Sequence, residues 1–266
     1  MAAEKFVELA GVRLHFGGGQ GTLAVDNLNM AVAAGEMAAV VGPSGCGKSS
    51  LMKLVAGLMP PTRGSIRVGG EAVKGPLKVV GMAFQNPSLL PWRTTLQNLM
   101  LPLQIVRPYR SSFNAERAKH EANAKQLLNR VGLRGFENQF PWQLSGGMQQ
   151  RASLCRALIH KPSLLMLDEP FGALDAFTRE DLWDVLQTMW MAEKFTTILV
   201  THDLREAVYL ADTVHVMSNR PGHIVDSYRV DLPRPRNAET PFLPEFTDLV
   251  HTLREQIRKE RAAAPL

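Results

Sequence analysis

The chain has 266 residues, enough to bury a large core in one domain or in a domain with a subdomain. Its net charge of +5 suits an anionic ligand or an anionic membrane surface and does not require nucleic acid. Two cysteines and seven scattered histidines give no disulfide framework and no metal-ligand spacing. Neither a signal peptide nor an apolar run of the ~20 residues that span a membrane is visible, so we expect a cytosolic protein.

Strands are predicted at the start of the chain. Residues 6–16 alternate loosely between apolar and polar side chains, and Leu28, Met30 and Val32 alternate in the same way. The continuous apolar run at 37–41 lies between turn signals, as expected of a strand that is buried on both faces.

A glycine-rich loop follows that buried strand and precedes a helical pattern at 50–58. Its sequence, GPSGCGKS at 42–49, has the G-x-x-x-x-G-K-S spacing of a phosphate-binding loop. Glycines let backbone N–H groups turn toward a polyphosphate, and the helix start adds partial positive charge. A plain strand-to-helix turn is the alternative. The candidate nucleotide ligands are Gly42, Pro43, Ser44, Gly45, Cys46, Gly47, Lys48, Ser49 and Ser50.

Two of these side chains have specific predicted roles. Lys48 would reach the β- and γ-phosphates of a nucleoside triphosphate, and the Ser49 hydroxyl would ligate Mg²⁺. The loop alone indicates a triphosphate and leaves open how its energy is used.

The pattern changes after two further predicted strands, at 65–68 and 78–84. The second carries Val80, Met82 and Phe84 on one face and ends at Gln85. Most of 95–160 is helical in pattern, which predicts an inserted helical subdomain at 86–160. A helix at 114–131 would carry an apolar stripe of Ala118, Ala122, Leu127 and Val131.

A second helix start of unusual composition lies within this subdomain. The sequence LSGGMQQR at 144–151 opens a helix predicted for 145–160. Ser145 can cap it, and Gly146 and Gly147 leave its N–H groups open to an anion. The alternative is a plain N-cap turn, which would not require two glycines.

Alternating strands and helices return after residue 161. An apolar strand at 163–167 ends in Asp168 and Glu169, the place where parallel sheets bind nucleotides. Asp168 would hold Mg²⁺ and Glu169 would deprotonate the attacking water; two solvent-exposed acids are the alternative. The remaining elements are helices at 175–194 and 204–210 and strands at 197–200, 213–217 and 224–230.

The last residues form a predicted tail. Residues 232–236, LPRPR, favour an extended linker. One face of a terminal helix carries apolar side chains and its end is basic, so it either packs on its own domain or lies on a membrane. The apolar residues are Phe246, Leu249, Val250, Leu253 and Ile257.

Taken together, the motifs resemble those of the ABC (ATP-binding-cassette) ATPases over roughly residues 5–230. The LSGGM sequence is similar to the family's signature, with Met148 where many members have Gln. Gln85 takes the place of the Q-loop glutamine, 172–175 of the D-loop, and 201–203 of the switch-histidine segment. Phe16 stands where an aromatic residue stacks on adenine.

The resemblance implies a fold and a division of the chain. The fold class is α/β, a P-loop NTPase (RecA-like) core with an antiparallel β-subdomain and the inserted helical subdomain. The core would comprise 1–85 and 161–230, and 231–266 would be a linker and an amphipathic helix.

The resemblance also implies that two copies sandwich each ATP. Ser145, Gly146, Gly147, Met148 and Asp175 of one copy would contact the nucleotide in the phosphate loop of the other. Glu169, His202 and Lys48 would be catalytic. Gln85 would sense Mg²⁺ and the γ-phosphate, with Ser49 and Asp168 as the other metal ligands.

Phrases around the motifs resemble the nitrate/sulfonate/taurine group of importer ATPases. They are GMAFQNPSLLPWRTTLQNL, LDEPFGALDAFTRE and the late SNRPGHI and VDLPRPR. The partners implied are two transmembrane permease subunits and, indirectly, an external solute-binding protein, at the cytoplasmic face of the membrane and without nucleic acid. The turn at 91–93 would receive a permease helix, unless Trp92 only anchors the subdomain.

Other readings remain as alternatives. A different transport system, for another solute or a lipid, shares the same motifs. ABC ATPases of DNA repair carry a long coiled coil, and no sustained heptads occur here; translation factors of the family carry two cassettes. P-loop kinases and switch GTPases lack the signature helix. The sequence does not name the solute.

Overall fold

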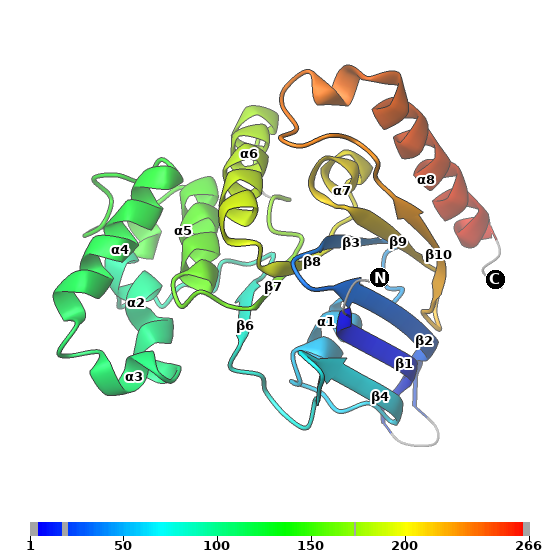
Figure 1. Cartoon of the computed structure of the whole chain (residues 1–266), viewed down its shortest axis with the longest axis horizontal. Helices are drawn as coiled ribbons and strands as arrows, with labels where there is room; N and C mark the ends of the chain where they lie inside the picture. The colour runs from blue at the N-terminus through cyan, green and yellow to red at the C-terminus, as the bar shows by residue number, and fades with distance from the viewer. Residues whose placement is uncertain (1–4, 18–20, 173, 263–266) are drawn as a thin grey trace. The chain divides into compact units, whose positions relative to one another are not determined.

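The computed structural model describes residues 5–17, 21–172 and 174–262, so Ala173 of the predicted D-loop lies outside the described residues. The chain forms two compact units, one of residues 1–77 and 194–266 and the other of residues 78–193. Figure 1 labels their helices and strands. None of the helices in the described ranges is both long enough and apolar enough to cross a membrane.

An antiparallel sheet opens the first unit. Its strands are β1 (Lys5–His15), β2 (Leu23–Ala33), β4 (Arg63–Val68) and β5 (Glu71–Ala72), in the order β2-β1-β4-β5. Side chains along β1 alternate between a buried and a more exposed face, with Val7 and Leu9 among the buried ones. The strands predicted at 6–16 and 65–68 and the antiparallel β-subdomain are confirmed.

Parallel strands form the centre of the same unit. β3 (Met37–Val41) pairs in parallel with β8 (Thr196–Val200) and with β9 (Thr213–Met217), and β10 (Ile224–Arg229) pairs antiparallel with β9. All five residues of β3 are buried, which explains why this strand has no polar alternation. The helices of the unit are α1 (Lys48–Val55), α7 (Leu204–Leu210) and α8 (Pro244–Ala262).

The second unit joins a parallel strand pair to helices. β6 (Val80–Ala83) pairs with β7 (Leu164–Asp168). The helices are α2 (Thr95–Ile105), α3 (Tyr109–Ser112), α4 (Arg117–Arg130), the short 3₁₀ helix η2 (Pro141–Gln143), α5 (Gly146–Leu158) and α6 (Ala176–Glu193).

The buried face of β6 is its small-residue face. Gly81 and Ala83 are buried, whereas Phe84 is exposed. A Cβ atom on Gly81 would lie 2.1 Å from the carbonyl oxygen of Ala157, so α5 approaches the strand at backbone distance. The larger side chains of the strand therefore lie on the opposite face from this packing.

The apolar stripe predicted for α4 is partly wrong. Ala118 and Ala122 are exposed, and the buried positions of the helix are His120, Ala124, Leu127 and Leu128. His120 stacks on Phe113, with ring centroids 5.8 Å apart. The buried face of the helix thus includes a histidine that lies outside the predicted stripe, and an aromatic neighbour covers its ring.

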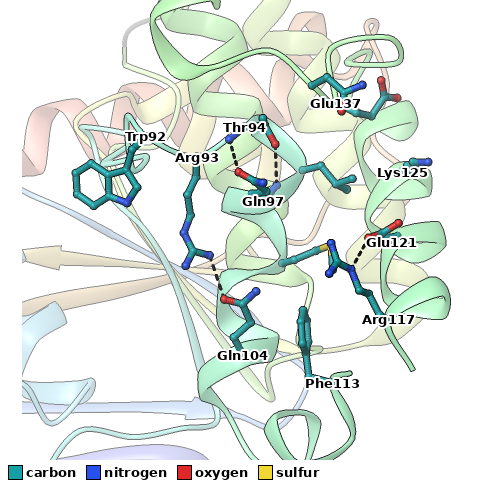
Figure 2. Close-up of a pocket in the computed structure, with 13 residues that line it drawn as sticks. Trp92, Arg93, Thr94, Gln97, Gln104, Phe113, Arg117, Glu121, Lys125 and Glu137 are labelled. Carbon is teal, nitrogen blue, oxygen red and sulfur yellow. Dashed lines mark hydrogen bonds and ion pairs between the residues drawn. The ribbon is translucent and has the colours of Figure 1, made fainter. Parts of the chain in front are cut away.

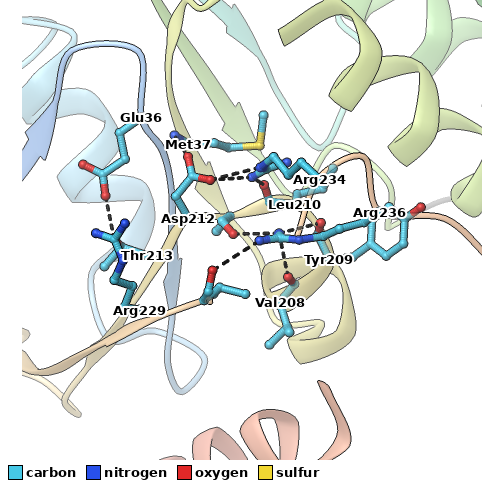
Figure 3. A network of polar contacts seen from close by, with 12 residues as sticks. Glu36, Met37, Val208, Tyr209, Leu210, Asp212, Thr213, Arg229, Arg234 and Arg236 are labelled. Carbon is cyan, nitrogen blue, oxygen red and sulfur yellow. Dashed lines mark hydrogen bonds and ion pairs between the residues drawn. The ribbon is translucent and has the colours of Figure 1, made fainter. Parts of the chain in front are cut away.

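The prediction of an extended linker at 232–236 missed two structural arginines. Arg236 is 2% exposed and donates to the carbonyl oxygens of Val208, Tyr209 and Ala211, at 2.7–3.0 Å. These carbonyls lie at the C-terminal end of α7, where the last carbonyl groups of a helix have no N–H donor within the helix. Arg234 pairs with Asp212 at 2.8 Å, as Figure 3 shows. The segment is therefore fixed to the first unit.

The terminal helix α8 follows the short 3₁₀ helix η3 (Thr240–Phe242) and packs on its own unit. Phe246 and Leu253 are its buried residues, and it contacts α7 and β9. The packed alternative for this amphipathic helix is thereby confirmed.

Candidate functional site

Two polar loops of the first unit leave neighbouring strands at the same end. β3 leads into the loop at 42–47, and β8, its parallel neighbour, leads into Thr201 and His202. Val40 lies opposite Val200, and the N–H of Thr201 donates to the Val40 carbonyl at 3.3 Å. The structure thus places the predicted phosphate loop beside the predicted switch-histidine segment.

The phosphate loop is closed around the side chain of Lys48. This lysine is 8% exposed, and its Nζ donates to the carbonyl oxygens of Gly42 at 2.8 Å and Pro43 at 2.9 Å. Gly47 has φ 110°, a conformation that L side chains rarely adopt. A Cβ on Gly42 would meet the Met217 carbonyl at 2.7 Å. The ammonium group is therefore held within a backbone cradle.

The helix start that follows this loop has no side-chain cap. The N-cap of α1 is Gly47, which has no side chain, and its first turn holds no acidic residue. By contrast, α2 starts with a capping box in which Thr94 and Gln97 satisfy each other's backbone N–H groups. The start of α1 therefore offers orphan N–H groups and a buried cation together. This arrangement fits the phosphate groups of a nucleotide.

The other candidate residues of this unit are accessible. His202 is exposed, and the next residue, Asp203, caps α7 by accepting from the N–H groups of Arg205 and Glu206. Phe16 is 41% exposed just after β1, with its N–H bonded to the Thr22 carbonyl at 2.9 Å. Both side chains are open to a ligand on the surface of the unit.

In the second unit, the strand pair brings Gln85 and the two acids to one end. Ala83 of β6 lies opposite Leu167 of β7, so Gln85 and Asp168 follow at neighbouring strand ends. Asp168 and Glu169 are half-buried, and Gln85 is exposed. Glu169 has φ 47°, in the left-handed region that non-glycine residues seldom occupy, a conformation that four other non-glycine residues of the described ranges share.

The signature sequence forms the start of α5 as expected. The Ser145 hydroxyl accepts from the Met148 N–H at 3.3 Å. A Cβ on Gly146 would meet nothing within 4 Å, so the helix start is open beside it. The side-chain amide of Gln150 donates to the Phe84 carbonyl at 3.1 Å, which joins this helix to the residue before Gln85. The signature helix and Gln85 are thus parts of one hydrogen-bonded structure.

Asp175 begins α6 in a similar way. Its Oδ1 accepts from the Thr178 N–H at 3.0 Å. Hydrogen bonds from Thr178, backbone and side chain, lower the pKa of the Asp175 carboxyl. Asp175 is exposed, so a carboxylate stands at the surface at the start of the helix.

Over the described ranges no group of three or more His, Cys, Asp or Glu side chains is placed to hold a metal. Mg²⁺ prefers such a setting, since it is usually bound by one or two protein oxygens with phosphates and waters. Of the predicted metal ligands, Ser49 belongs to the first unit and Asp168 to the second, and each side chain carries an oxygen atom of the kind that Mg²⁺ binds.

A groove of about 900 Å³ lies among α2, α4 and the turn at 91–94 of the second unit (Figure 2). Leu96, Met100 and Phe113 are apolar residues of a lining that also contains many polar and charged side chains. Trp92 is 69% exposed, so its ring is not packed as an anchor. One ion pair and one hydrogen bond lie along the groove: Arg117 pairs with Glu121 at 2.9 Å, and Arg93 donates to the Gln104 side-chain oxygen at 3.0 Å.

Two polar contacts of this site were missed from the sequence. Gln150 lies in the signature stretch, but nothing in its spacing shows that it reaches Phe84. Arg220 donates to the carbonyl of Gly45 in the phosphate loop at 3.1 Å, from 175 residues away in the chain. Its only sequence signal is the Arg-Pro-Gly turn at 220–222.

Comparisons with known proteins show the family to which the chain belongs. The family model described as "ABC transporter" matches residues 25–172. The aliphatic sulfonates import ATP-binding protein SsuB of Bacillus licheniformis is 43% identical over 90% of this chain and 87% of that protein. The taurine import ATP-binding protein TauB of Yersinia pestis is 44% identical over 78% of each chain.

A solved structure shows the same fold. The ATP-binding cassette MJ0796, in a dimeric post-hydrolysis state bound to ADP and Pi, superposes with a TM-score of 0.74 at 29% identity. The superposition covers 85% of this chain and 100% of the MJ0796 chain. The expected fold class is confirmed. The chain belongs to the ABC transporter family, as an ATP-binding and ATP-hydrolysing cassette with the P-loop NTPase fold.

Proposed function

We propose that this chain is the ATPase subunit of an importer for a small, anionic solute of the sulfonate or taurine kind. The observation that carries the proposal is the closed phosphate loop around Lys48, in a chain 43% identical to a sulfonate import ATP-binding protein. The relatives named for sulfonates and taurine support the solute class. Nitrate-like solutes belong to the same class of small anions.

The first unit would bind the nucleotide. Backbone N–H groups of 42–50 would face its phosphates, with Lys48 between the β- and γ-phosphates, and Phe16 would stack on adenine. Ser49, Asp168 and Gln85 would hold Mg²⁺. When bound, Mg²⁺ neutralises charge on the phosphate oxygens. The buried position of Lys48 supports this assignment, because a buried ammonium group requires an anionic or strongly polar partner.

Glu169 would act as the general base for the attacking water. Its position after β7 and its left-handed backbone, φ 47°, support this role, since such strain persists mainly where function requires a fixed geometry. His202 would contact the γ-phosphate and support the same attack. Hydrolysis would then require the carboxylate of Glu169 to take a proton from water as the water oxygen attacks the γ-phosphorus, while the bond from that phosphorus to the bridging oxygen breaks and ADP leaves.

Two copies of the chain would complete each site. The open helix start at Ser145, Gly146, Gly147 and Met148 would face the γ-phosphate held by the partner, and Asp175 would touch the partner's site. The dimeric state of the MJ0796 structure supports this arrangement. ATP would thus stabilise the closed dimer, and hydrolysis would remove that link.

The groove of the second unit would receive the permease. Its mixed lining of apolar and charged side chains suits a short amphipathic helix, and exposed Trp92 offers an anchoring ring. An external solute-binding protein would deliver the solute to that permease. The chain would therefore lie at the cytoplasmic face of the membrane, with 86–160 as the subdomain that contacts the permease, 1–85 and 161–230 as the core and 231–266 as the C-terminal part.

Purification from membranes tests this function. The full chain, expressed with its neighbouring genes and extracted in mild detergent, should copurify with a multi-span permease. Vesicles that hold this complex and the solute-binding protein should take up a sulfonate or taurine when ATP is supplied. Retention on DNA or ribosomes, without any permease, would contradict the proposal.

A further inference from the structure

The loop that joins β9 to β10, residues 218–223, packs directly on the phosphate loop. Arg220 is exposed, and its Nη2 donates to the Gly45 carbonyl at 3.1 Å. A Cβ atom on Gly222 would lie 2.1 Å from the Cys46 carbonyl oxygen. This loop, which we call the support loop, therefore touches two consecutive residues of the phosphate loop.

Hydrogen bonds to β2 and within the loop itself hold the support loop in place. The N–H of Gly222 donates to the Ala24 carbonyl at 2.9 Å, and the N–H of Asp26 donates to the Gly222 carbonyl at 3.1 Å. Within the loop, the Ser218 hydroxyl accepts from the His223 N–H at 3.0 Å. Because these bonds fix the backbone, the guanidinium group of Arg220 reaches Gly45 from a defined position.

The contact with Gly45 bears on the orientation of one peptide group. In a trans peptide the carbonyl and the following N–H point in opposite directions. A guanidinium that holds the Gly45 carbonyl therefore also turns the Cys46 N–H away from Arg220. In this structure that N–H is 3.4 Å from the Pro43 carbonyl, which also accepts from Lys48. The Cys46 N–H thus points toward the part of the loop that holds the ammonium group.

The support loop also contacts the end of the terminal helix. Asn219, next to Arg220, donates through Nδ2 to the Glu260 carbonyl in the last turn of α8. The last four carbonyls of a helix have no partner within the helix, so this side chain supplies one. Two consecutive residues thus connect the end of α8 to the phosphate loop.

We propose that Arg220 is a positioning residue for nucleotide binding, and that α8 sets nucleotide affinity through Asn219 and the support loop. This inference rests on the role of residues 42–50 in the proposed function. Arg220 orients the Gly45–Cys46 peptide before the nucleotide arrives, so that less reorganisation is needed on binding. The ligand class is a nucleoside di- or triphosphate, because the phosphates are the part of the nucleotide that would contact the Gly45–Cys46 peptide.

Calorimetry with ADP on the full chain tests the role of Arg220. Arg220→Ala should weaken ADP binding by about 5- to 20-fold, the usual effect of losing one charge-assisted hydrogen bond, and Arg220→Lys should restore part of it. Arg220→Gln supplies the measurement if the alanine variant does not fold. Arg229→Ala is the matched control, because Arg229 lies in the adjoining strand, its side chain is 81% exposed and it pairs with Asp231, which is exposed as well. The affinity of the Arg229→Ala variant for ADP should equal that of the unchanged chain.

The control Lys48→Ala separates this inference from the proposed function. If Lys48→Ala loses ADP binding while Arg220→Ala and Arg220→Gln both keep it, the positioning role is overturned and the phosphate loop assignment stands. If Lys48→Ala also keeps full affinity, the phosphate loop assignment itself fails.

Hydrogen exchange tests the connection to α8. Coupling is reciprocal, so ADP should slow amide exchange in the last turn of α8 in the unchanged chain. Asn219→Ala should abolish this protection and weaken ADP binding by about 2- to 5-fold, as expected for one neutral hydrogen bond. Equal exchange at 258–262 with and without ADP in the unchanged chain would overturn the proposed coupling.

Discussion

Gln150 of the signature helix donates its side-chain amide to the carbonyl oxygen of Phe84, the residue before Gln85, at 3.1 Å. Gln150 is 3% exposed and Phe84 is 36% exposed, so this bond is partly shielded from water. It gives the signature helix and the Q-loop a common anchor within one compact unit. A change at Gln85 can therefore be transmitted to the helix start that would face the second ATP.

Gln150→Leu should weaken this coupling. The variant keeps the side-chain volume but leaves the Phe84 carbonyl without its donor, which typically costs about 1–3 kcal/mol when the group is buried. ATP hydrolysis should fall more than ADP affinity, because the nucleotide ligands at 42–50 belong to the other unit. Steady-state hydrolysis and calorimetry measure the two effects, and equal losses in both would contradict the role in coupling.

Glu169→Gln should stop turnover and keep ATP binding. An amide cannot accept the proton of the attacking water, and loss of a general base typically lowers the rate by ~10²–10⁴-fold. ATP should then hold two copies together, which size-exclusion chromatography with ATP can detect. Asp184→Asn, on α6, is a charge-matched control outside the site. Near-normal hydrolysis by Glu169→Gln would rule out the general-base assignment.

Trp92→Ala should weaken permease coupling more than the hydrolysis by the isolated chain. The ring is 69% exposed at the groove, so its removal takes contact area from a partner and little from the fold. Phe242→Ala removes another exposed aromatic ring, 75% exposed and in the other unit, and serves as the control. The readout is copurification with the permease. Equal losses of coupling and isolated hydrolysis would make Trp92 an internal anchor.

Arg236→Met should destabilise the first unit by about 2–4 kcal/mol, because the buried carbonyls of Val208, Tyr209 and Ala211 lose their donor. Burial lowers the pKa of Arg236 to about 10, so the group is still charged at neutral pH. Urea unfolding gives the change in free energy. Arg258→Met, at an exposed site on α8, should change it little. Equal stability of the two variants would show that the carbonyl contacts contribute nothing.

Stability should also fall as the pH drops below about 6.5, the ordinary histidine value. Burial lowers the pKa of His215, and it also lowers the pKa of His160. Below pH 6.5 the unfolded chain therefore binds more protons than the folded chain does. The contribution of these histidines to the free energy of unfolding decreases as the pH falls below 6.5 and is constant above it. In urea unfolding series between pH 7.5 and 5.5, His215→Gln should reduce the slope of the unfolding free energy against pH. An unchanged slope would exclude His215 as a source.

Much of the fold followed from local patterns in the sequence. The buried strand at 37–41, the helix at 204–210 and the strand at 213–217 are found with the predicted bounds, because apolar runs and caps define them locally. The motif residues of the candidate site were likewise visible from spacing. What local patterns could not show were contacts between distant segments.

Arg236 and Arg220 illustrate this limit. Both lie in segments rich in Pro, Gly and Arg that read as linker or turn, yet each donates to carbonyls at least 25 residues away. His120 is similar, since the rings of Phe113 and Tyr109 both pack against this buried histidine of α4. Tertiary packing decided all three positions, and a single sequence carries no pattern for it.

The central claim is that each ATP is hydrolysed between the phosphate loop of one copy and the signature of another. Two inactive variants test it when mixed: Lys48→Ala, which removes the ammonium group of the loop, and Gly146→Asp, which places a negative charge at the signature without a clash, since nothing lies within 4 Å of its Cβ. Each variant alone should be inactive. The mixture should regain hydrolysis, because a mixed dimer holds one intact loop opposite one intact signature. No recovery in a mixture shown to form mixed dimers would contradict the claim.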